Sequence, residues 1–495
     1  MADIDRRSVL RRAAAVAGGT VLGGPFLGFV NRASAEPAGA SGGFRELRPV
    51  PDLRDGVVRL WLPADFQYRS FHDTEVPVEL DDGTNLPGRH DGMGAFAARG
   101  KRCKPGNFLL VRNHELNNAG PAFGDASEAY DPMAQGGTTT VEVTRFGEVV
   151  RSYTSLNGTQ MNCSGGRMPW GSWVSCEETV NGPDVGPDFT GSPNTALTQR
   201  HGFVFEVPVD GESDREPLTS AGRFAHESVA FDPHGGALYL TEDNFGFPSG
   251  FYRYKPRRNP MHTGRLRNGG RLQMLKVKGR PNLNLAAAQP DNATYRVEWV
   301  DIDDPAPTFP YTPGQPAPTT NDTALTHVGR QGWDQGAAFF SRLEGSAYDD
   351  GKVYFTATQG GGPAETGLGP IPDGYGNGSG QIWAYDIRSS TLRLMFQSPG
   401  PDVLDFPDNV TTSPRGTLVV CEDNVNSNYI RGLSRHGQLF DIALNRLVSS
   451  TGTPRFDDEF AGSTFSPDGH TLFINIQASR GMTFAIWGPW RRIGV

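Results

Sequence analysis

Residues 238–244 read Leu-Tyr-Leu-Thr-Glu-Asp-Asn, a short apolar run that ends in two acids and an amide. Nearly the same run recurs at residues 173–179 and 418–424, and weaker versions begin at residues 109, 353 and 472. Several of the intervals between these copies are about 65 residues long. A repeat at such an interval indicates one supersecondary unit that is used repeatedly along the chain.

A turn precedes most copies of this run. Residues 232–236 (Asp-Pro-His-Gly-Gly) lead into the copy at residue 238, and residues 467–469 (Pro-Asp-Gly) lead into the copy at residue 472. Pro or Asp followed by Gly between two apolar runs is typical of a β-hairpin. Each repeat therefore predicts a pair of antiparallel strands.

Polar residues lie at the matching ends of these hairpins. In four repeats, a polar residue that begins the first strand lies 14 or 15 residues before one that ends the second strand. Antiparallel strands start and finish side by side, so each hairpin brings the two residues together at one rim. The pairs are Cys163 with Glu177 and Glu178, Glu227 with Glu242, Asp408 with Glu422 and Asp423, and, less regularly, Glu344 with Thr358 and Gln359.

Residues 1–35 have the pattern of an export signal. Arg6 and Arg7 precede a mildly apolar, Gly-rich run up to Val30, and residues 33–35 (Ala-Ser-Ala) form a small-residue cleavage site. This order is typical of a twin-arginine secretory signal, and the glycines and Pro25 argue against the alternative of a transmembrane anchor. We expect the twin-arginine export machinery to deliver the mature chain to the periplasm or the extracellular space.

The charge of the chain bears on its partners. Removing residues 1–35 removes five Arg and two Asp, which leaves 41 basic and 53 acidic residues and a net charge of −12. This balance argues against nucleic acid or an anionic membrane as the main partner. It suits a protein that binds several cations, although an ordinary soluble acidic protein would share it. No later stretch is long and apolar enough to span a bilayer.

Composition favours an all-β fold. The chain has 63 Gly and 38 Pro in 495 residues and few segments with helical periodicity, which indicates many turns. We predict a six-bladed β-propeller that occupies residues 36–495 as one domain. Residues 255–335 interrupt the repeat with many prolines and little strand pattern, so they are either a lid or a linker. We favour an ordered insertion over the axial site, because Trp333 and Asp334 lead directly into the next repeat.

The polar strand ends form the candidate site. So many carboxylates on one face cannot all be ionised unless cations neutralise them. Oxygen ligands suit Ca²⁺, whereas the thiolate of Cys163 suits a transition metal such as iron. The alternatives are that the acids are solvated turn residues and that Cys163 is a buried structural cysteine. Cys176 and Cys421 occupy the slot held by Thr241 in another repeat, which predicts small buried side chains without a disulfide.

A family resemblance rests on six strings in the sequence. They are residues 162–166 (Asn-Cys-Ser-Gly-Gly), 169–179, 225–227 (Ala-His-Glu), 241–243 (Thr-Glu-Asp), 342–345 (Arg-Leu-Glu-Gly) and 422–424 (Glu-Asp-Asn). They resemble the PhoX family of twin-arginine-exported alkaline phosphatases, and the likeness covers the signal and nearly all of the mature chain. The segment from Cys163 to Glu178 is its most specific part.

The resemblance implies a six-bladed propeller whose axial site holds two iron ions and three calcium ions. A metal-activated oxo or hydroxide would attack small-molecule phosphate esters there. By position, Cys163 would be an iron ligand, Glu178 and Glu227 carboxylates of the cluster, and Arg342 and Glu344 an Arg-x-Glu pair at the site. Asp408 or Asn409 and Glu422 match further metal-binding positions. We also expect a monomer without a membrane contact in the mature form.

The rim residues and the resemblance together define the predicted site. The predicted metal-binding residues are Cys163, Glu177, Glu178, Glu227, Glu242, Glu344, Asp408, Asn409, Glu422 and Asp423. The predicted catalytic residues are Arg342, Cys163 and Glu344.

The sequence departs from the family pattern in the last repeat. Residues 475–477 are followed by Ala-Ser-Arg, where the family commonly has His-Pro-Gly, and the position equivalent to the acids is Ala461-Gly462. Two other functions therefore stay open: another calcium-dependent propeller hydrolase, such as a lactonase, and a non-enzymatic propeller with structural ions.

Overall fold

The computed structural model describes residues 46–99, 103–117, 119–313, 315–363 and 377–495. The predicted export signal, residues 1–35, lies outside these ranges. Within them, no helix has both the length and the apolar character needed to cross a membrane.

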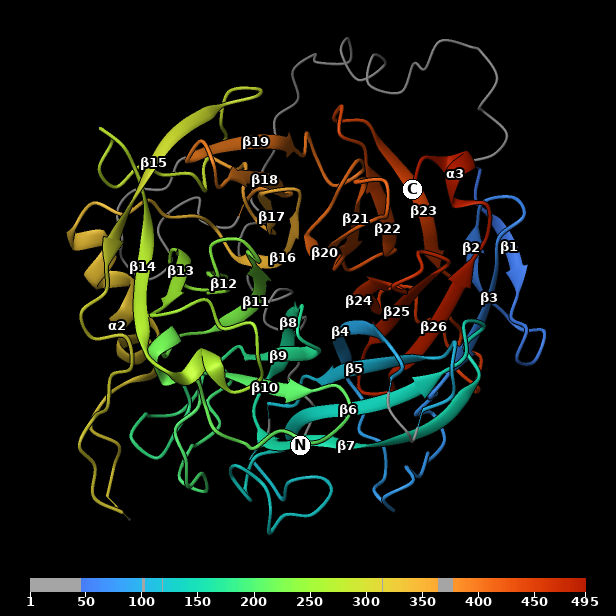
Figure 1. Cartoon of the computed structure of the whole chain (residues 1–495), viewed down its shortest axis with the longest axis horizontal. Helices are drawn as coiled ribbons and strands as arrows, with labels where there is room; N and C mark the ends of the chain where they lie inside the picture. Colours follow the sequence, from blue (N-terminus) through green and yellow to red (C-terminus); the bar gives the residue numbers. More distant parts are fainter. Residues whose placement is uncertain (1–45, 100–102, 118, 314, 364–376) are drawn as a thin grey trace.

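These described residues form five antiparallel sheets arranged around a common axis (Figure 1). The first comprises β4 (His90–Ala97), β5 (Phe108–His114), β6 (Gly136–Val143) and β7 (Val149–Thr159), and the second β8 (Asn162–Met168), β9 (Ser172–Glu177) and β10 (Val204–Pro208). The third has the spatial order β11 (His226–Phe231), β12 (Leu238–Glu242), β13 (Phe251–Pro256), β14 (Gly270–Val277), β15 (Thr294–Asp301), β19 (Thr391–Gln397), β18 (Gln381–Asp386), β17 (Lys352–Ala357) and β16 (Leu343–Asp349).

The other two sheets include the N-terminal strands. The fourth comprises β20 (Pro407–Thr412), β21 (Leu418–Glu422), β22 (Tyr429–Leu433) and β23 (Leu439–Asn445), with β2 (Val58–Leu62) and β1 (Arg48–Pro51) at its outer edge. The fifth comprises β24 (Glu459–Phe465), β25 (Thr471–Gln477), β26 (Met482–Trp487) and β3 (Gln67–Phe71). In the described residues, the helical elements are α2 (Asn321–Asp334), α3 (Trp490–Ile493) and the 3-10 turns η1 (Thr219–Ala221) and η2 (Arg265–Arg267).

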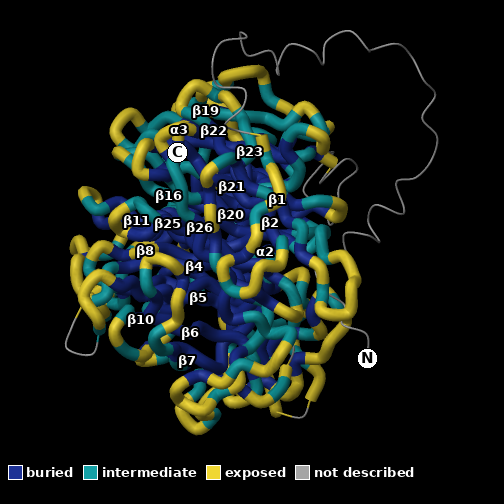
Figure 2. The backbone as a smooth tube through the Cα atoms, turned by 90° about the vertical axis from the view of Figure 1, so that its right-hand side faces the viewer, coloured by how far each residue is buried: buried dark blue, intermediate teal, exposed yellow. Residues whose placement is uncertain are grey.

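The innermost strands form a closed ring. Neighbouring strands contact one another in the order β4, β8, β11, β16, β20, β24 and back to β4. They are largely buried, as the dark central region of Figure 2 shows. The all-β prediction and its propeller-like arrangement are therefore confirmed.

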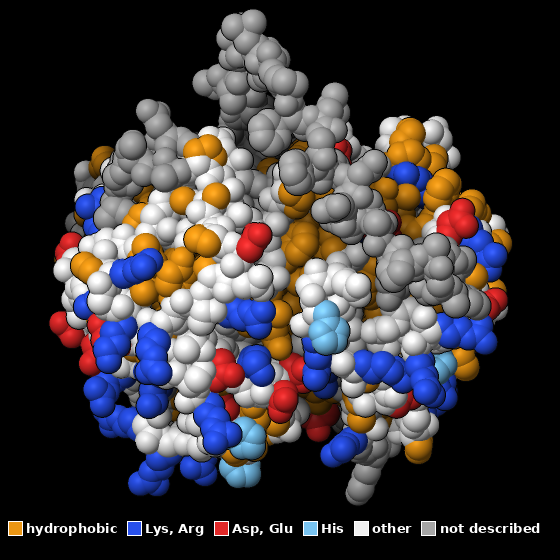
Figure 3. All heavy atoms as spheres, turned by 90° about the horizontal axis from the view of Figure 1, so that it is seen from above, with side chains coloured by type: hydrophobic (Ala, Val, Ile, Leu, Met, Phe, Trp, Pro, Cys, Tyr) orange, Lys and Arg blue, Asp and Glu red, His pale blue; other side chains and the backbone are white. Residues whose placement is uncertain are grey.

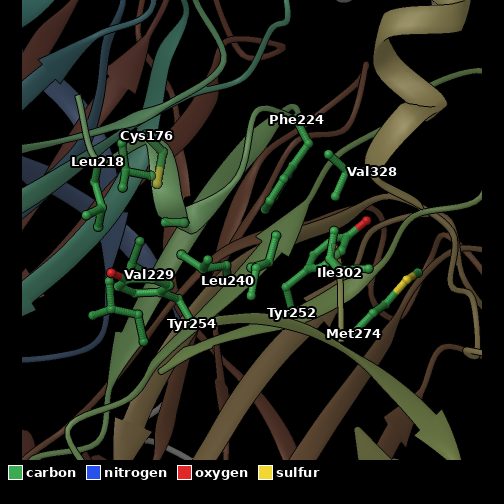
Figure 4. Packing of buried hydrophobic residues seen from close by; sticks show 14 of the residues in the cluster. Cys176, Leu218, Phe224, Val229, Leu240, Tyr252, Tyr254, Met274, Ile302 and Val328 are labelled. Atoms are coloured by element: carbon green, nitrogen blue, oxygen red, sulfur yellow. The ribbon is translucent and has the colours of Figure 1, made fainter. Parts of the chain in front are cut away.

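Side-chain alternation explains how the sheets pack. In Figure 4, Val229, Leu240, Tyr252, Tyr254 and Met274 come from β11 to β14 and point into one hydrophobic cluster. Residues of a strand alternate between its two faces, so every second residue of these strands enters the core. Helix α2 adds Val328, which is fully buried in the same cluster.

The predicted insertion, residues 255–335, contains more regular structure than its sequence indicates. It includes all of β14, β15 and α2, and β15 pairs with β19 through Thr294↔Arg393 and Arg296↔Thr391. This pairing joins β11–β15 to β16–β19 in one sheet at the outer rim of the molecule (Figure 1).

The surface carries mixed charge: on the face in Figure 3, Lys and Arg gather toward the lower part with Asp and Glu among them.

The N-terminal strands complete the two C-terminal sheets. β3 pairs with β26 through Phe71↔Thr483 and Tyr68↔Ile486, and β2 pairs with β23 through Leu60↔Asn445. The Tyr68 hydroxyl is fully buried and accepts hydrogen bonds from the backbone N–H groups of Arg59 (2.8 Å) and Leu60 (3.3 Å). One side chain thus ties β3 to β2.

We predict that Tyr68→Phe lowers the free energy of unfolding by about 1–3 kcal/mol, because the backbone N–H of Arg59 loses a buried acceptor. Urea denaturation followed by tryptophan fluorescence measures the change. Tyr311→Phe is the matched control, since Tyr311 is 38% exposed. Equal stability of the two variants would contradict the conclusion that Tyr68 stabilises the contact between β3 and β2.

Candidate metal centre

Each innermost strand has a β-bulge near its start. Two residues of the inner strand there oppose one residue of the second strand. A bulge re-aims the side chain of its extra residue, and such irregularities are common next to functional sites. The first residues of the six bulges are Asp91, Cys163, Glu227, Glu344, Asp408 and Gly462.

The second strand of each hairpin contributes a residue just after its last paired position. The backbone N–H of Glu178 donates to Met161, that of Asp243 to Ala225, and that of Asp423 to Phe406. These bonds hold the chain that leaves the second strand against the start of the inner strand.

Four groups of donor side chains converge at the bulges. Within each group, the ligand atoms lie within 4.8 Å of one another. The groups are Cys163, Glu178 and Glu227; Glu178, Asp243 and Glu344; Glu227, Glu344 and Asp408; and Asp408, Asp423 and Glu459. Because consecutive groups share members, they form one continuous cluster of seven carboxylates and a thiol.

Burial makes this cluster electrostatically costly without cations. None of its eight residues is more than 4% exposed. Burial raises the pKa of the Cys163 thiol well above its usual range, and the carboxylates of Glu227 and Glu178 raise it further. Carboxylates this close cannot all be ionised unless positive charge lies among them. The donor set therefore fits bound metal ions.

Arg342 brings positive charge into the cluster. It lies immediately before β16 with a φ of 49° and is fully buried. Its Nε donates to Asp243 Oδ1 (3.0 Å), and its Nη2 donates to Asp243 Oδ2 (2.8 Å) and Glu344 Oε1 (2.7 Å). The Phe245 ring lies 4.3 Å from the guanidinium carbon. A single guanidinium cannot balance seven carboxylates.

The acid doublets divide into two environments. Glu178 and Asp423 belong to the donor groups, whereas Glu177, Glu242 and Glu422 do not. Glu177 accepts from the backbone N–H groups of Gln160, Gly202 and Phe203 and from His201 Nδ1 (2.6 Å).

Protein donors surround the other two acids as well. Glu242 accepts from Gly250 N and the Tyr252 hydroxyl, and burial raises the pKa of its carboxyl to about 8. Glu422 accepts from Arg431 Nε (3.0 Å) and from the backbone N–H groups of Asp405 and Tyr429.

Asn409 contacts its neighbour in the cluster. Its Nδ2 donates to Asp408 Oδ1 (2.8 Å), and its Oδ1 accepts from the backbone N–H of Gly462 (2.8 Å). The Asn409 amide thus links the Asp408 carboxylate to the backbone of the bulge at Gly462.

Two cluster residues lie outside the predicted ligand set. Asp243 is a rim acid of the repeat at residue 238, and Glu459 is the first residue of β24. Gly462 occupies the bulge of the last sheet and has no side chain. Before this bulge, β24 pairs with β25 from Glu459↔Gln477 to Ala461↔Asn475, so Glu459 lies at the start of the strand. The run Asp457-Asp458-Glu459 just before an apolar strand is the signal that points to Glu459.

The cysteines opposite the bulges match the sequence analysis. Cys176 and Cys421 each oppose a bulge, as Thr241 does in β12, and both are fully buried free thiols.

Beyond the bulges, the axis opens into a cavity of about 650 Å³ whose lining includes Ser164, Val229 and Val410.

This is a propeller-like all-β fold whose axis carries buried carboxylates and a thiol, a donor set that fits metal ions. The sequence matches the family model described as alkaline phosphatase PhoX over residues 43–152 and 147–479. The chain belongs to the PhoX alkaline phosphatase family, and the predicted enzyme class, a PhoX-like alkaline phosphatase, is confirmed by this match.

Solved structures support the fold. A structure described as Pseudomonas fluorescens PhoX in complex with vanadate, a transition state analogue, aligns with a TM-score of 0.62 at 17% identity and covers 91% of this chain and 98% of that one. Virginiamycin B lyase from Staphylococcus aureus (TM-score 0.37, 12% identity, 86% and 99% covered) and a gluconolactonase from Xanthomonas campestris (0.33, 13%, 84% and 100%) are too distant to carry an argument. A search of the curated proteins finds no match.

We predict that substitutions of the two acids of one doublet have different effects on stability in the presence of a chelator. Glu178→Gln removes one of several close negative charges, so the thermal midpoint should rise or stay unchanged. Glu177→Gln disturbs four hydrogen bonds and should cost about 1–3 kcal/mol. Differential scanning fluorimetry compares both with the wild type. An equal loss of stability in both variants would contradict the assignment of Glu178 to the charged cluster.

Proposed function

We propose that this chain is a secreted metal-dependent phosphatase that hydrolyses small-molecule phosphate esters at the axial cluster. The observation that carries this proposal is the continuity of the four donor groups, which Glu178, Glu227, Glu344 and Asp408 link to one another. Membership of the PhoX family supports phosphate esters as the substrate class.

The proposal includes the organisation of the whole chain. Residues 36–495 would form one six-bladed propeller with an insertion at about residues 255–335, which the closed ring of six innermost strands supports. Residues 1–35 would direct a monomer through the twin-arginine pathway to the periplasm or beyond. The pattern of Arg6, Arg7 and residues 33–35 supports this destination.

The donor chemistry supports two kinds of metal. Cys163 with Glu178 and Glu227 would hold iron, because a thiolate suits a transition metal. The groups that contain only carboxylates would hold calcium, which prefers oxygen ligands. The family resemblance implies two iron ions and three calcium ions. When bound, these ions would neutralise charge on the phosphoryl oxygens and make the attacking oxygen nucleophilic at working pH.

The remaining predicted ligands would act on the cluster through their neighbours. Protein donors already engage Glu177, Glu242 and Glu422, so we assign them to holding the strand ends. Asn409 would orient Asp408. Asp243 and Glu459 join the ligand set in their place.

Arg342 would bind the phosphoryl group of the substrate. Asp243 and Glu344 fix its guanidinium from two sides, so its orientation is set before a substrate arrives. A positioned guanidinium is well suited to phosphate oxygens, because its planar donors form strong charge-assisted hydrogen bonds. Glu344 would orient Arg342 and contribute to the cluster at the same time.

Metal content separates this function from its rivals. We expect protein purified from its native host to contain both iron and calcium and to release p-nitrophenol from its phosphate ester at alkaline pH. Chelator should abolish this release, because the buried carboxylates need cations. Elemental analysis beside the assay provides the test. Calcium alone without phosphatase activity would favour a lactonase-like enzyme, and inactivity with full metal content would favour structural ions.

Arg342 gives a second test. We predict that Arg342→Lys lowers kcat/KM for p-nitrophenyl phosphate by about 10²–10³-fold, because lysine cannot reproduce the fixed guanidinium geometry. Arg431→Lys is the control, since Arg431 pairs with Glu422 outside the donor groups. Steady-state kinetics with matched metal content compares the two. Similar kcat/KM values in both variants would remove Arg342 from substrate binding.

A further inference from the structure

The segment between Asp243 and Asp291 has a charge opposite to that of the chain. It contains no Asp or Glu, although the whole chain has a net charge of −9. Its cations are Arg253, Lys255, Arg257, Arg258, Arg265, Arg267, Arg271, Lys276, Lys278 and Arg280. These residues lie in or near β13, η2 and β14, away from the axial cluster.

Strand alternation gathers some of these cations on one face. Tyr252 and Tyr254 of β13 point into the core (Figure 4), so Arg253 and Lys255 lie on the opposite face of the strand. That face is buried at Phe251 and becomes exposed toward Lys255, and this exposed part is called the outer face below. On β14, Leu272 and Met274 are buried while Arg271 and Gln273 face outward. The register places Arg253 opposite Gln273 and Lys255 opposite Arg271.

The outer face forms a cationic groove. It has a volume of about 570 Å³ and is lined by Arg253, Lys255, Pro256, Arg257, Gly270, Arg271 and Gln273. Lys255 and Arg271 are direct cross-strand neighbours, and like charges in this position destabilise a sheet. An anion between them would offset this repulsion.

Few of the groove's charges are neutralised within the protein. Asp301 lies at its edge, where it accepts from Gln273 Nε2 (2.7 Å) and lies 3.5 Å from Arg271 Nη1. In the described ranges, Lys255 and Arg257 form no ion pair. The groove therefore has four cations against one acid at its margin.

Arg253 is held ready for a ligand. Its Nε and Nη2 donate to Gln273 Oε1 at 3.1 and 2.6 Å, and its guanidinium carbon lies 4.4 Å from the Trp299 ring centroid. A side chain fixed in this way loses little conformational freedom when an anion binds.

We propose that this groove binds a linear phosphodiester polymer without stacking bases, for which poly(glycerol phosphate) is the probe. Alternate strand residues are about 7 Å apart, so the cations from Arg253 to Arg257 extend over about 13 Å, farther than a single phosphate can reach. Among the residues that the structure describes, no aromatic side chain lines the groove, and stacking on such side chains is how proteins hold single-stranded nucleic acid. The inference rests on charge and shape and is independent of the proposed phosphatase activity.

Fluorescence anisotropy with a fluorescein-labelled poly(glycerol phosphate) oligomer tests the groove in the full chain. We expect the variant Lys255→Glu/Arg257→Glu to weaken binding by at least about tenfold at low salt. The slope of log Kd against log salt should fall by about two, one unit for each lost phosphate contact. Lys255→Gln/Arg257→Gln should show an intermediate loss. Both residues are exposed, so an unchanged thermal midpoint should show that the fold is intact.

Matched controls separate the groove from net charge and from catalysis. Arg388→Glu/Arg491→Glu makes the same charge change at two exposed sites outside the groove and should bind as the wild type does. Turnover of p-nitrophenyl phosphate should be the same in all variants. Absence of binding by the wild type, or an equal loss in the control variant, would overturn the proposal. Tighter binding of an oligothymidylate of equal charge would overturn the polymer class in favour of nucleic acid.

Discussion

A β-bulge near the start of every innermost strand decides where the polar side chains of this protein point. Without the bulges, strand alternation would point the first residue of each bulge toward one face of its sheet. With them, Cys163, Glu227, Glu344 and Asp408 meet at the axis. Side chains opposite several bulges then fix the backbone of the next innermost strand around the ring: Asn113 donates to the carbonyl of Cys163, Thr241 to that of Glu344 and Thr356 to that of Asp408. The site is therefore held by bonds between neighbouring hairpins.

The same convergence carries an electrostatic cost. Two carboxylate oxygens 4.8 Å apart repel by about 3 kcal/mol at an effective dielectric constant of about 20, and the cluster contains several such pairs. Arg342 offsets part of this repulsion through Asp243 and Glu344. Bound cations would offset the rest, and metal binding would then be coupled to the stability of the ring. The N-terminal strands β2 and β3, which complete the two C-terminal sheets, oppose the opening that this repulsion favours.

Much of this arrangement could be predicted from the sequence, because the repeat and its turns specify hairpins and a hairpin brings matching ends together. The sequence could not show which acid of each doublet faces the axis. Glu177 and Glu178 are adjacent, and a shift of one residue in register exchanges their environments. Glu459 escaped the prediction for a related reason: in the last sheet the acid lies three residues before the bulge at Gly462. Strand β14 was hidden by the prolines around it, although Leu272 and Met274 alternate with Arg271 and Gln273.

The distribution of charge in this protein follows from the bulges and from the electrostatic cost of gathering carboxylates at the axis. Acids are concentrated where bulges aim them inward and cations can neutralise them. The outer strands have no such partner, and β13 and β14 expose Arg253, Lys255 and Arg271 instead. Because the core lies between these two regions, the negative axis and the positive groove are separated by layers of apolar side chains such as Leu240 and Tyr252 (Figure 4). An anionic polymer in the groove would contact Arg and Lys side chains and not the cations at the axis. The two regions would therefore bind different ligands within one chain.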